Sequence, residues 1–228
     1  MIAIIDYDAG NLKNVENAFK KAGADPLITC DERIILNSEA VVLPGVGAFA
    51  DCMDSLVKKG MDKVVKDCID MGKPFLGICL GYQLLFERSE EHPEGHSEAK
   101  GLGVFKGSVR KFPTDLGLKI PHMGWNSLSF PKPCPLFENL PGKLFSDFGG
   151  DSSISDYKQS EESYFYFVHS YYVDVADRSM VSAIAQYGVP FVAAISKDNV
   201  YATQFHPEKS GKVGLAIIDN FLKVVRRV

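Results

Sequence analysis

The residues best suited to chemistry lie around Cys79, in the pentapeptide GICLG that runs from Gly77 to Gly81. Apolar residues precede and follow Cys79, and the sequence predicts a strand over 75–78 and a helix over 80–87. A small residue on each side of a nucleophile is typical of a nucleophile elbow, where side chains at positions 77 and 81 would collide with neighbouring backbone. The turn would place the Cys79 thiol at a helix start, whose first N–H groups can face developing negative charge. For this pentapeptide alone, a buried structural cysteine is an equally open alternative.

A nucleophilic cysteine needs a base, and the base needs a group that orients it. His206 follows a predicted strand in the segment YATQFHPEKSG, and Glu208 lies two residues further on. Residues two apart share a face in extended backbone, so Glu208 can accept from one imidazole nitrogen while the other nitrogen faces the thiol. A simple turn after a strand is the alternative for HPE alone. Together with the elbow, the pattern favours a Cys79–His206–Glu208 triad.

An acyl-transfer site also needs donors for an oxyanion. The N–H of Leu80, directly after the nucleophile, is one candidate. A second should come from a glycine-rich loop after another strand, and VVLPGVGAF over 41–49 fits this requirement. Gly45 and Gly47 have no side chain to keep a substrate away from the backbone. Alone the segment is an ordinary turn, but beside the triad it indicates an oxyanion loop.

The elements that must position these motifs alternate between strand and helix in the first half of the chain. Apolar runs over 2–5, 26–30, 40–43 and 75–78 alternate with helical spacing over 11–21, which Asn11 can cap, and over 50–71. This pattern predicts a parallel sheet covered on both faces. Further strands are predicted over 104–112, 127–130, 164–173, 181–187, 191–196 and 200–205, before a last helix over 211–226. We expect one α/β domain over 1–228 with an antiparallel or mixed extension and loop inserts at 90–100 and 142–163.

The composition argues against several classes of protein. A net charge of −4 and scattered lysines and arginines argue against a nucleic-acid binder. The N-terminus has no signal-peptide pattern, and no apolar stretch is long enough to span a membrane. Five widely spaced cysteines without a C-x-x-C pair suggest neither a disulfide framework nor a zinc site. We therefore expect a cytoplasmic enzyme with reduced thiols, no metal and no cofactor.

Three motifs together, PGVGAF, GICLGYQLLF and QFHPEKS, resemble the class I (triad) glutamine amidotransferases. The stretches DYDAGNLKNV, GLGVFKGSVRKF, PHMGWN and YFYFVHSYYV narrow the resemblance to the glutaminase subunits of imidazole glycerol phosphate synthase, in histidine biosynthesis. The resemblance covers nearly the whole chain and thins at the two inserts, chiefly over 142–163. It implies a three-layer, flavodoxin-like α/β fold with a mostly parallel central sheet.

The resemblance also implies a role for each matching residue. Cys79 would attack the carboxamide of glutamine, His206 would act as base and then as acid to ammonia, and Glu208 would orient His206. Gln83, one helical turn after Cys79, would help to hold the glutamine. The backbone around the substrate would come from Gly45, Val46, Gly47, Ser170 and Tyr171. A thioester would form, and water would then release glutamate.

The ammonia must be transferred under cover, because free ammonia in water near neutral pH is mostly protonated and no longer nucleophilic. The sequence contains no phosphate-loop or dinucleotide motif that would mark a second active site. In the resembled family the partner is a separate (β/α)8-barrel cyclase that forms a heterodimer with the glutaminase. The resemblance places Asn11, Asn14, Met123, Trp125, Asn126 and Lys209 at or near that interface.

Three alternatives remain open at this stage. A glutaminase subunit of another synthase, such as one amidating a surface sugar, would keep every motif quoted above. A stand-alone cysteine hydrolase acting on γ-glutamyl bonds would be active without a partner and would need neither Gln83 nor PHMGWN. A non-catalytic interaction protein on this fold would be expected to have lost a member of the triad, and all three members are present.

Overall fold

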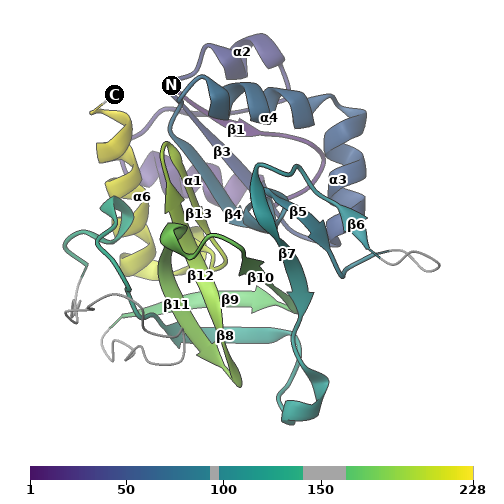
Figure 1. The fold of residues 1–228 in the computed structure, drawn as a ribbon. Coiled ribbons are helices and arrows are strands. Elements are labelled where there is room, and N and C mark those ends of the chain that lie inside the picture. The colour runs from purple at the N-terminus through teal and green to yellow at the C-terminus, as the bar shows by residue number, and fades with distance from the viewer. Residues whose placement is uncertain (93–97, 141–162, 228) are drawn as a thin grey trace.

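The computed structural model describes residues 1–92, 98–140 and 163–227, and a large central sheet organises them (Figure 1). Eleven strands form this sheet within the described residues, and β11 (Val181–Tyr187) pairs with β12 beside the main order. That order is β2 (Pro26–Thr29), β1 (Ile2–Ile5), β3 (Ala40–Gly45), β4 (Phe75–Cys79), β13 (Val200–Thr203), β12 (Val189–Lys197), β10 (Tyr171–Val175), β7 (Phe105–Lys111), β5 (Phe86–Ser89) and β6 (Ala99–Lys100).

The strand directions divide this sheet into two parts. Strands β2, β1, β3, β4 and β13 run parallel, whereas β12 is antiparallel to β13, β11 and β10, and β10 is antiparallel to β7. Strand β5 is parallel to β7 and antiparallel to β6. The predicted α/β fold, with a parallel central sheet and a mixed extension, is confirmed.

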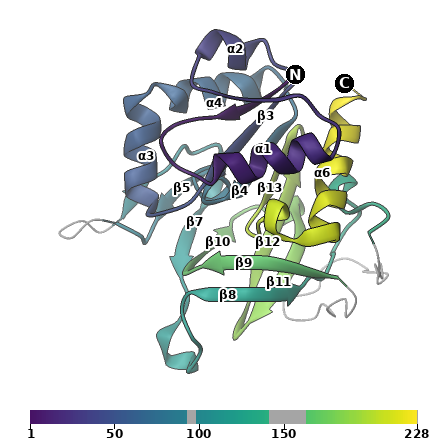
Figure 2. The same ribbon diagram turned by 180° about the vertical axis from the view of Figure 1, so that it is seen from behind.

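Helices cover both faces of the parallel part and complete three layers. Helices α1 (Leu12–Lys21) and α6 (Gly211–Val225) lie on one face (Figure 2). Helices α2 (Glu32–Leu36), α3 (Phe49–Lys58) and α4 (Met61–Asp70) lie on the other. Strand β1 is buried along its length, and its side chains alternate between the two cores because successive residues of a strand point to opposite faces. Short 3-10 helices lie at Thr114–Leu116, Pro135–Phe137, Arg178–Met180 and Pro207–Lys209, the last of which is η5.

A second, two-stranded antiparallel sheet packs on the α1–α6 side. Strand β8 (His122–Ser127) pairs along its whole length with β9 (Tyr164–His169). The sequence predicted a strand over 127–130 and one continuous strand over 164–173. Instead, β8 ends at Ser127, and the run over 164–173 divides at Ser170 between β9 and β10, which belong to different sheets. A continuous aromatic run therefore concealed a crossing between two sheets.

The helix predicted over 80–87 is also shorter in the structure. Helix α5 spans only Leu80–Gln83, and the chain then forms β5, which pairs with β7. Leu84, Leu85 and Phe86 are all fully buried, and a short apolar run of this kind does not distinguish a buried strand from a helix by its period. Asn11 precedes α1 as predicted, but its side chain makes no capping hydrogen bond.

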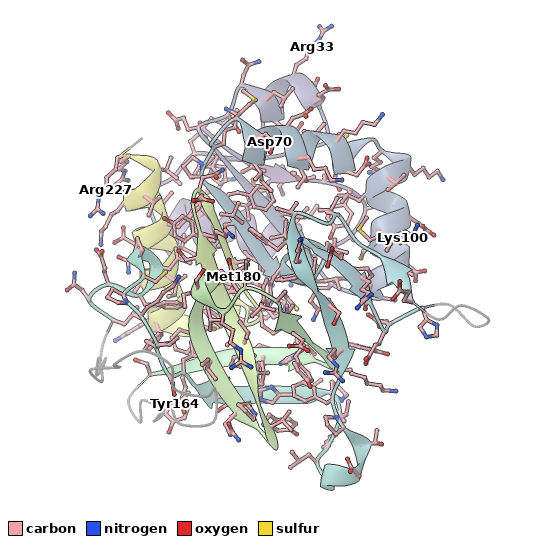
Figure 3. All side chains as sticks on the ribbon, in the orientation of Figure 1. Arg33, Asp70, Lys100, Tyr164, Met180 and Arg227 are labelled. Carbon is pink, nitrogen blue, oxygen red and sulfur yellow. The ribbon has the colours of Figure 1, made fainter. Side chains whose placement is uncertain are left out.

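Several predictions concern residues outside the described part. The predicted insert at 142–163 lies there except for Ser163, and so do residues 93–97 of the insert at 90–100. The single domain over 1–228 stays a prediction. Arg33, Lys100 and Arg227 project at separate edges of the molecule (Figure 3), consistent with scattered basic charge. Among the described residues, none of the helices combines the length and the apolar character that crossing a membrane requires.

Candidate active site

Cys79 occupies a strained turn between β4 and α5. Its backbone has φ 55° and ψ −108°, a conformation that residues with a side chain rarely adopt. A side chain at Gly81 would lie 1.9 Å from the carbonyl oxygen of Leu43, so this position excludes any Cβ. A Cβ at Gly77 would be tight, at 3.1 Å from the carbonyl oxygen of Gly81. The elbow predicted from GICLG is therefore sterically required, most strictly at position 81.

His206 and Glu208 form the hydrogen-bonded pair that the sequence predicted. Nδ1 of His206 lies 2.8 Å from Oε1 of Glu208, and both side chains are almost completely buried. Pro207 begins η5, so a tight turn separates the two residues. Nε2 of His206 has no hydrogen-bond partner among the described residues. This nitrogen is therefore the one available for chemistry.

The charges around His206 favour its protonated form. Burial alone would lower the pKa of His206, but the Cys79 thiolate and the Glu208 carboxylate outweigh burial and raise the pKa of His206 to about 10. An imidazolium stabilised in this way stabilises a neighbouring thiolate in turn. It also holds the proton that a leaving amine needs.

Cys79 and His206 line one cavity of about 250 Å³. The volume suits a small molecule rather than a drug-sized ligand. The other lining residues are Val46, Gly47, Leu80, Gln83, Glu91, Pro121, Val168, His169, Ser170 and Tyr171. The structure thus collects most of the predicted site residues around the thiol, with Glu208 behind His206. A nucleophile, a base, an orienting carboxylate and a small cavity together suit acyl transfer.

The loop after β3 packs directly on the elbow. A Cβ at Gly45 would lie 2.8 Å from the backbone nitrogen of Gly81, so glycine is required for this close approach, although Gly45 itself does not line the cavity. The hydroxyl of Tyr7 donates to the carbonyl of Pro44 at 2.7 Å. The thiol of Cys52 donates to the carbonyl of Val46 at 3.4 Å. Two buried side chains that the sequence did not single out therefore hold this loop.

Gln83 and Gln204 form an amide pair beside the thiol. Nε2 of Gln83 donates to Oε1 of Gln204 at 2.9 Å and to the carbonyl of Tyr171 at 3.0 Å. Nε2 of Gln204 approaches Sγ of Cys79 at 3.8 Å. Because both N–H groups of Gln83 are used, its carbonyl oxygen is the group left for a ligand. The sequence predicted Gln83 but not Gln204, which precedes His206 by two residues in the same motif.

Glu91 is a second site residue that the sequence did not single out. It lies in the loop insert predicted over 90–100, but it lines the cavity, and its carboxylate accepts from the backbone N–H of Phe49 at 2.9 Å. Burial raises the pKa of Glu91. The local signal was misleading because Glu91 lies among several acidic residues of a turn-rich segment. Within the described residues, no group of His, Cys, Asp and Glu side chains is arranged to hold a metal ion.

Several predicted interface residues gather on the outer face, which we define as Met123, Trp125, Tyr166 and Lys209. Met123 and Trp125 are 60% and 56% exposed. The Trp125 and Tyr166 rings meet edge to face at 5.8 Å, and Nζ of Lys209 lies 5.7 Å from the centre of the Tyr166 ring. This grouping leaves large apolar side chains in solvent, which is typical of a binding surface.

The remaining interface predictions divide into two groups. Asn11 and Asn14 lie at the start of α1, which contacts η5 near Lys209. Figure 2 shows α1, β9 and β8 one above another on the same side of the molecule. Asn126 does not belong to the outer face, because its side chain donates to the carbonyl of Gln186 at 2.8 Å and approaches Nε2 of His122 at 3.5 Å.

Comparison with known proteins relates the chain to one family. The family model for glutamine amidotransferase class-I matches residues 3–225. Imidazole glycerol phosphate synthase subunit HisH from Syntrophotalea carbinolica is 46% identical over 226 residues, which cover 97% of this chain and 98% of that protein. The subunit HisH from Caldanaerobacter subterraneus subsp. tengcongensis is also 46% identical, with 99% of each chain covered. The structure of PurLQS from Thermotoga maritima is similar at a TM-score of 0.69 and 17% identity, covering 98% of both chains, which supports the fold.

Proposed function

The chain belongs to the class I glutamine amidotransferases and, within them, to the imidazole glycerol phosphate synthase subunit HisH family, and from this premise we propose that Cys79, His206 and Glu208 are its catalytic residues. It is the glutaminase subunit of that synthase, in histidine biosynthesis. The main support for these catalytic residues is that Cys79 and His206 line one cavity, while Glu208 is hydrogen-bonded to Nδ1 of His206.

In the proposed reaction, Sγ of Cys79 attacks the side-chain carboxamide carbon of glutamine. The tetrahedral oxyanion accepts hydrogen bonds from the N–H of Leu80 and from the backbone of the loop around Val46 and Gly47. His206 gives its proton to the leaving nitrogen as the C–N bond breaks, so ammonia departs and a glutamyl thioester remains. His206 then removes a proton from water, which attacks the thioester carbon and releases glutamate and the thiol.

The cavity wall also provides groups for the amino-acid head of glutamine. Gln83, Ser170 and Tyr171 line the cavity. The carboxylate of Glu91 complements the α-ammonium group of an amino acid, and its burial strengthens that attraction. We assign Glu91 to substrate binding for this reason.

We propose that the partner is a separate (β/α)8-barrel cyclase, bound through the outer face and the start of α1 in a heterodimer. The exposed side chains of Met123 and Trp125 support this surface, because large apolar groups at the centre of an interface contribute most to affinity. Strand β9, whose Tyr166 belongs to the outer face, also lies beside Cys79, with the carbonyl of Val168 4.0 Å from Sγ. The thiol therefore lies close to the strand that carries part of the proposed interface. We further propose a cytoplasmic location, since all five cysteines are free.

The proposed function is tested by glutamine hydrolysis with and without the cyclase and its nucleotide substrate. We expect slow hydrolysis by the isolated chain and strong stimulation in the loaded complex, because an idle glutaminase wastes substrate. Cys79→Ala should abolish turnover in the complex while leaving the fold and partner binding intact. Cys30→Ala is the matched control, since Cys30 is an exposed thiol outside the cavity. Turnover that survives in Cys79→Ala would contradict the assignment, and full activity of the isolated chain would favour a stand-alone hydrolase.

A further inference from the structure

A pair of buried histidines lies next to the active site but has no part in the reaction described above. His122 in β8 and His169 in β9 are direct partners in the register of the small sheet. The two residues are 4% and 6% exposed, and Nδ1 of His122 lies 3.0 Å from Nε2 of His169. A cross-strand pair shares one face of the sheet, so both rings point inward, away from the outer face.

The hydrogen-bond partners fix the position of every proton in this pair. Nδ1 of His169 lies 2.8 Å from the carbonyl oxygen of Tyr171, which can only accept, so this nitrogen carries the hydrogen. Nε2 of a neutral His169 is then an acceptor, and it receives a bond from Nδ1–H of His122. Nε2 of His122 accepts in turn from Nδ2 of Asn126, whose orientation is set by its bond to the carbonyl of Gln186. All the bonds run in one direction, from Asn126 to Tyr171.

The surroundings keep both rings neutral. Burial lowers the pKa of His169 to about 3 and that of His122 to about 4, and the nearby charge of His206 also lowers the pKa of His169. The His122 ring is stacked between Phe167, at 5.0 Å, and Tyr187, at 4.0 Å. A proton added to Nε2 of His169 would oppose the Nδ1–H of His122 at the 3.0 Å contact, and a proton added to Nε2 of His122 would oppose the N–H of Asn126. The chain of bonds therefore exists only while both imidazoles are neutral.

The receiving end of this chain is part of the cavity wall. The carbonyl of Tyr171 accepts from Gln83 as well as from His169, and the carbonyl of Ser170 accepts from the N–H of Phe112 at 3.1 Å. Ser170 and Tyr171 form the point where the chain leaves the small sheet and enters the large one. This segment therefore depends on three donors to hold its position against the cavity.

We propose that His122 and His169 are positioning residues which, as neutral imidazoles in one fixed tautomer, hold the Ser170–Tyr171 segment in the conformation that binds glutamine. The proposal rests on the proposed function of the cavity. The donating end lies in β8, the strand whose opposite side carries Met123 and Trp125.

Two substitutions at position 169 separate positioning from packing. In His169→Asn the amide can replace the Nδ1–H donor to Tyr171, whereas in His169→Gln the amide reaches only the Nε2 position and this donor is lost. In the complex with the cyclase, we expect His169→Gln to raise KM for glutamine about tenfold with kcat changed less, the effect of one lost hydrogen bond. His169→Asn should stay within about threefold of the wild type. Tyr187→Phe, which keeps the ring stacked on His122 but removes its bond to Lys119, is the control and should leave KM unchanged.

The tautomers provide a readout that does not depend on activity. In ¹⁵N spectra of histidine-labelled wild type, both rings should carry the proton on Nδ1 and should remain neutral from pH 8 to pH 5. Equal KM values for the two His169 variants, or a proton on Nε2 of His169, would overturn the proposal. If the wild-type complex hydrolysed no glutamine, the proposed function would fail instead, and the tautomers alone would decide whether this chain of bonds exists.

Discussion

Two buried pairs beside the cavity, His206 with Glu208 and His122 with His169, differ in charge although both are shielded from water. His206 contacts a carboxylate and a thiolate, and its pKa is raised, whereas His122 and His169 contact each other and a backbone carbonyl, and their pKa values are lowered. Burial pushes every imidazole toward the neutral form, so the partner decides the outcome. His206, which must move a proton, has charged neighbours. His122 and His169, which hold backbone in place, have neutral neighbours.

We expect catalysis to depend on the negative charge beside His206. Glu208→Gln keeps the shape of the side chain but takes away the negative charge, so the pKa of His206 should fall and its orientation should loosen. We expect kcat for glutamine hydrolysis in the complex to fall by about 10²–10⁴-fold, as for the loss of an orienting carboxylate in other triads. Glu90→Gln, a half-exposed carboxylate outside the cavity, is the matched control. A Glu208→Gln variant with kcat within about threefold of wild type would contradict the assigned role.

The neutral pair should make the protein sensitive to acid. Its folded-state pKa values lie below the ordinary value of 6.5, so the unfolded chain binds protons more readily, and the free energy of unfolding should decrease as pH falls from about 6.5 toward 4. His122→Phe removes one of these titrating groups and retains an aromatic ring between Phe167 and Tyr187. Between pH 7 and pH 5, this variant should lose about 1 to 2 kcal/mol less than wild type in urea unfolding. An identical loss in both proteins would show that His122 is not held neutral by the fold.

Gln204 links the two pairs. We expect its substitution to change catalysis less than the loss of the Glu208 charge. It approaches Sγ of Cys79 and accepts from Gln83, which shares the carbonyl of Tyr171 with His169. Gln204→Leu should therefore lower kcat/KM for glutamine about tenfold, equivalent to one or two hydrogen bonds. The control is Gln186→Leu, in which the backbone carbonyl that holds Asn126 is retained. An unchanged kcat/KM in Gln204→Leu would show that the two pairs act independently.

Local patterns predicted which residues lie together beside the cavity, and their catalytic roles stay a proposal. GICLG and HPE each place their residues through a single turn, and PGVGAF begins at the end of the neighbouring strand β3, so short-range geometry suffices. The prediction of a parallel sheet covered on both faces required only the alternation of apolar runs with helices. The triad geometry thus depends mainly on backbone turns that the sequence specifies directly.

The missed features depend on contacts between distant segments. Gln204 meets Gln83 across 121 positions, and His122 meets His169 only because β8 pairs with β9. Strand β8 escaped prediction because Gly124 and Asn126 occupy inward positions where apolar residues would mark a strand. The division at Ser170 was concealed because both flanking strands are aromatic. These relations follow from the topology, which no local pattern contains.

In the proposed reaction Cys79, assisted by His206 and Glu208, forms a covalent glutamyl thioester. Acid quenching of the wild-type complex during glutamine turnover, followed by mass spectrometry of its peptides, detects this intermediate. We expect one glutamyl group on the peptide that contains Cys79 and none on the four other cysteines, and we expect no glutamyl group in Cys79→Ala. A glutamyl group on another residue, or turnover in a Cys79→Ala complex, would contradict the proposed reaction.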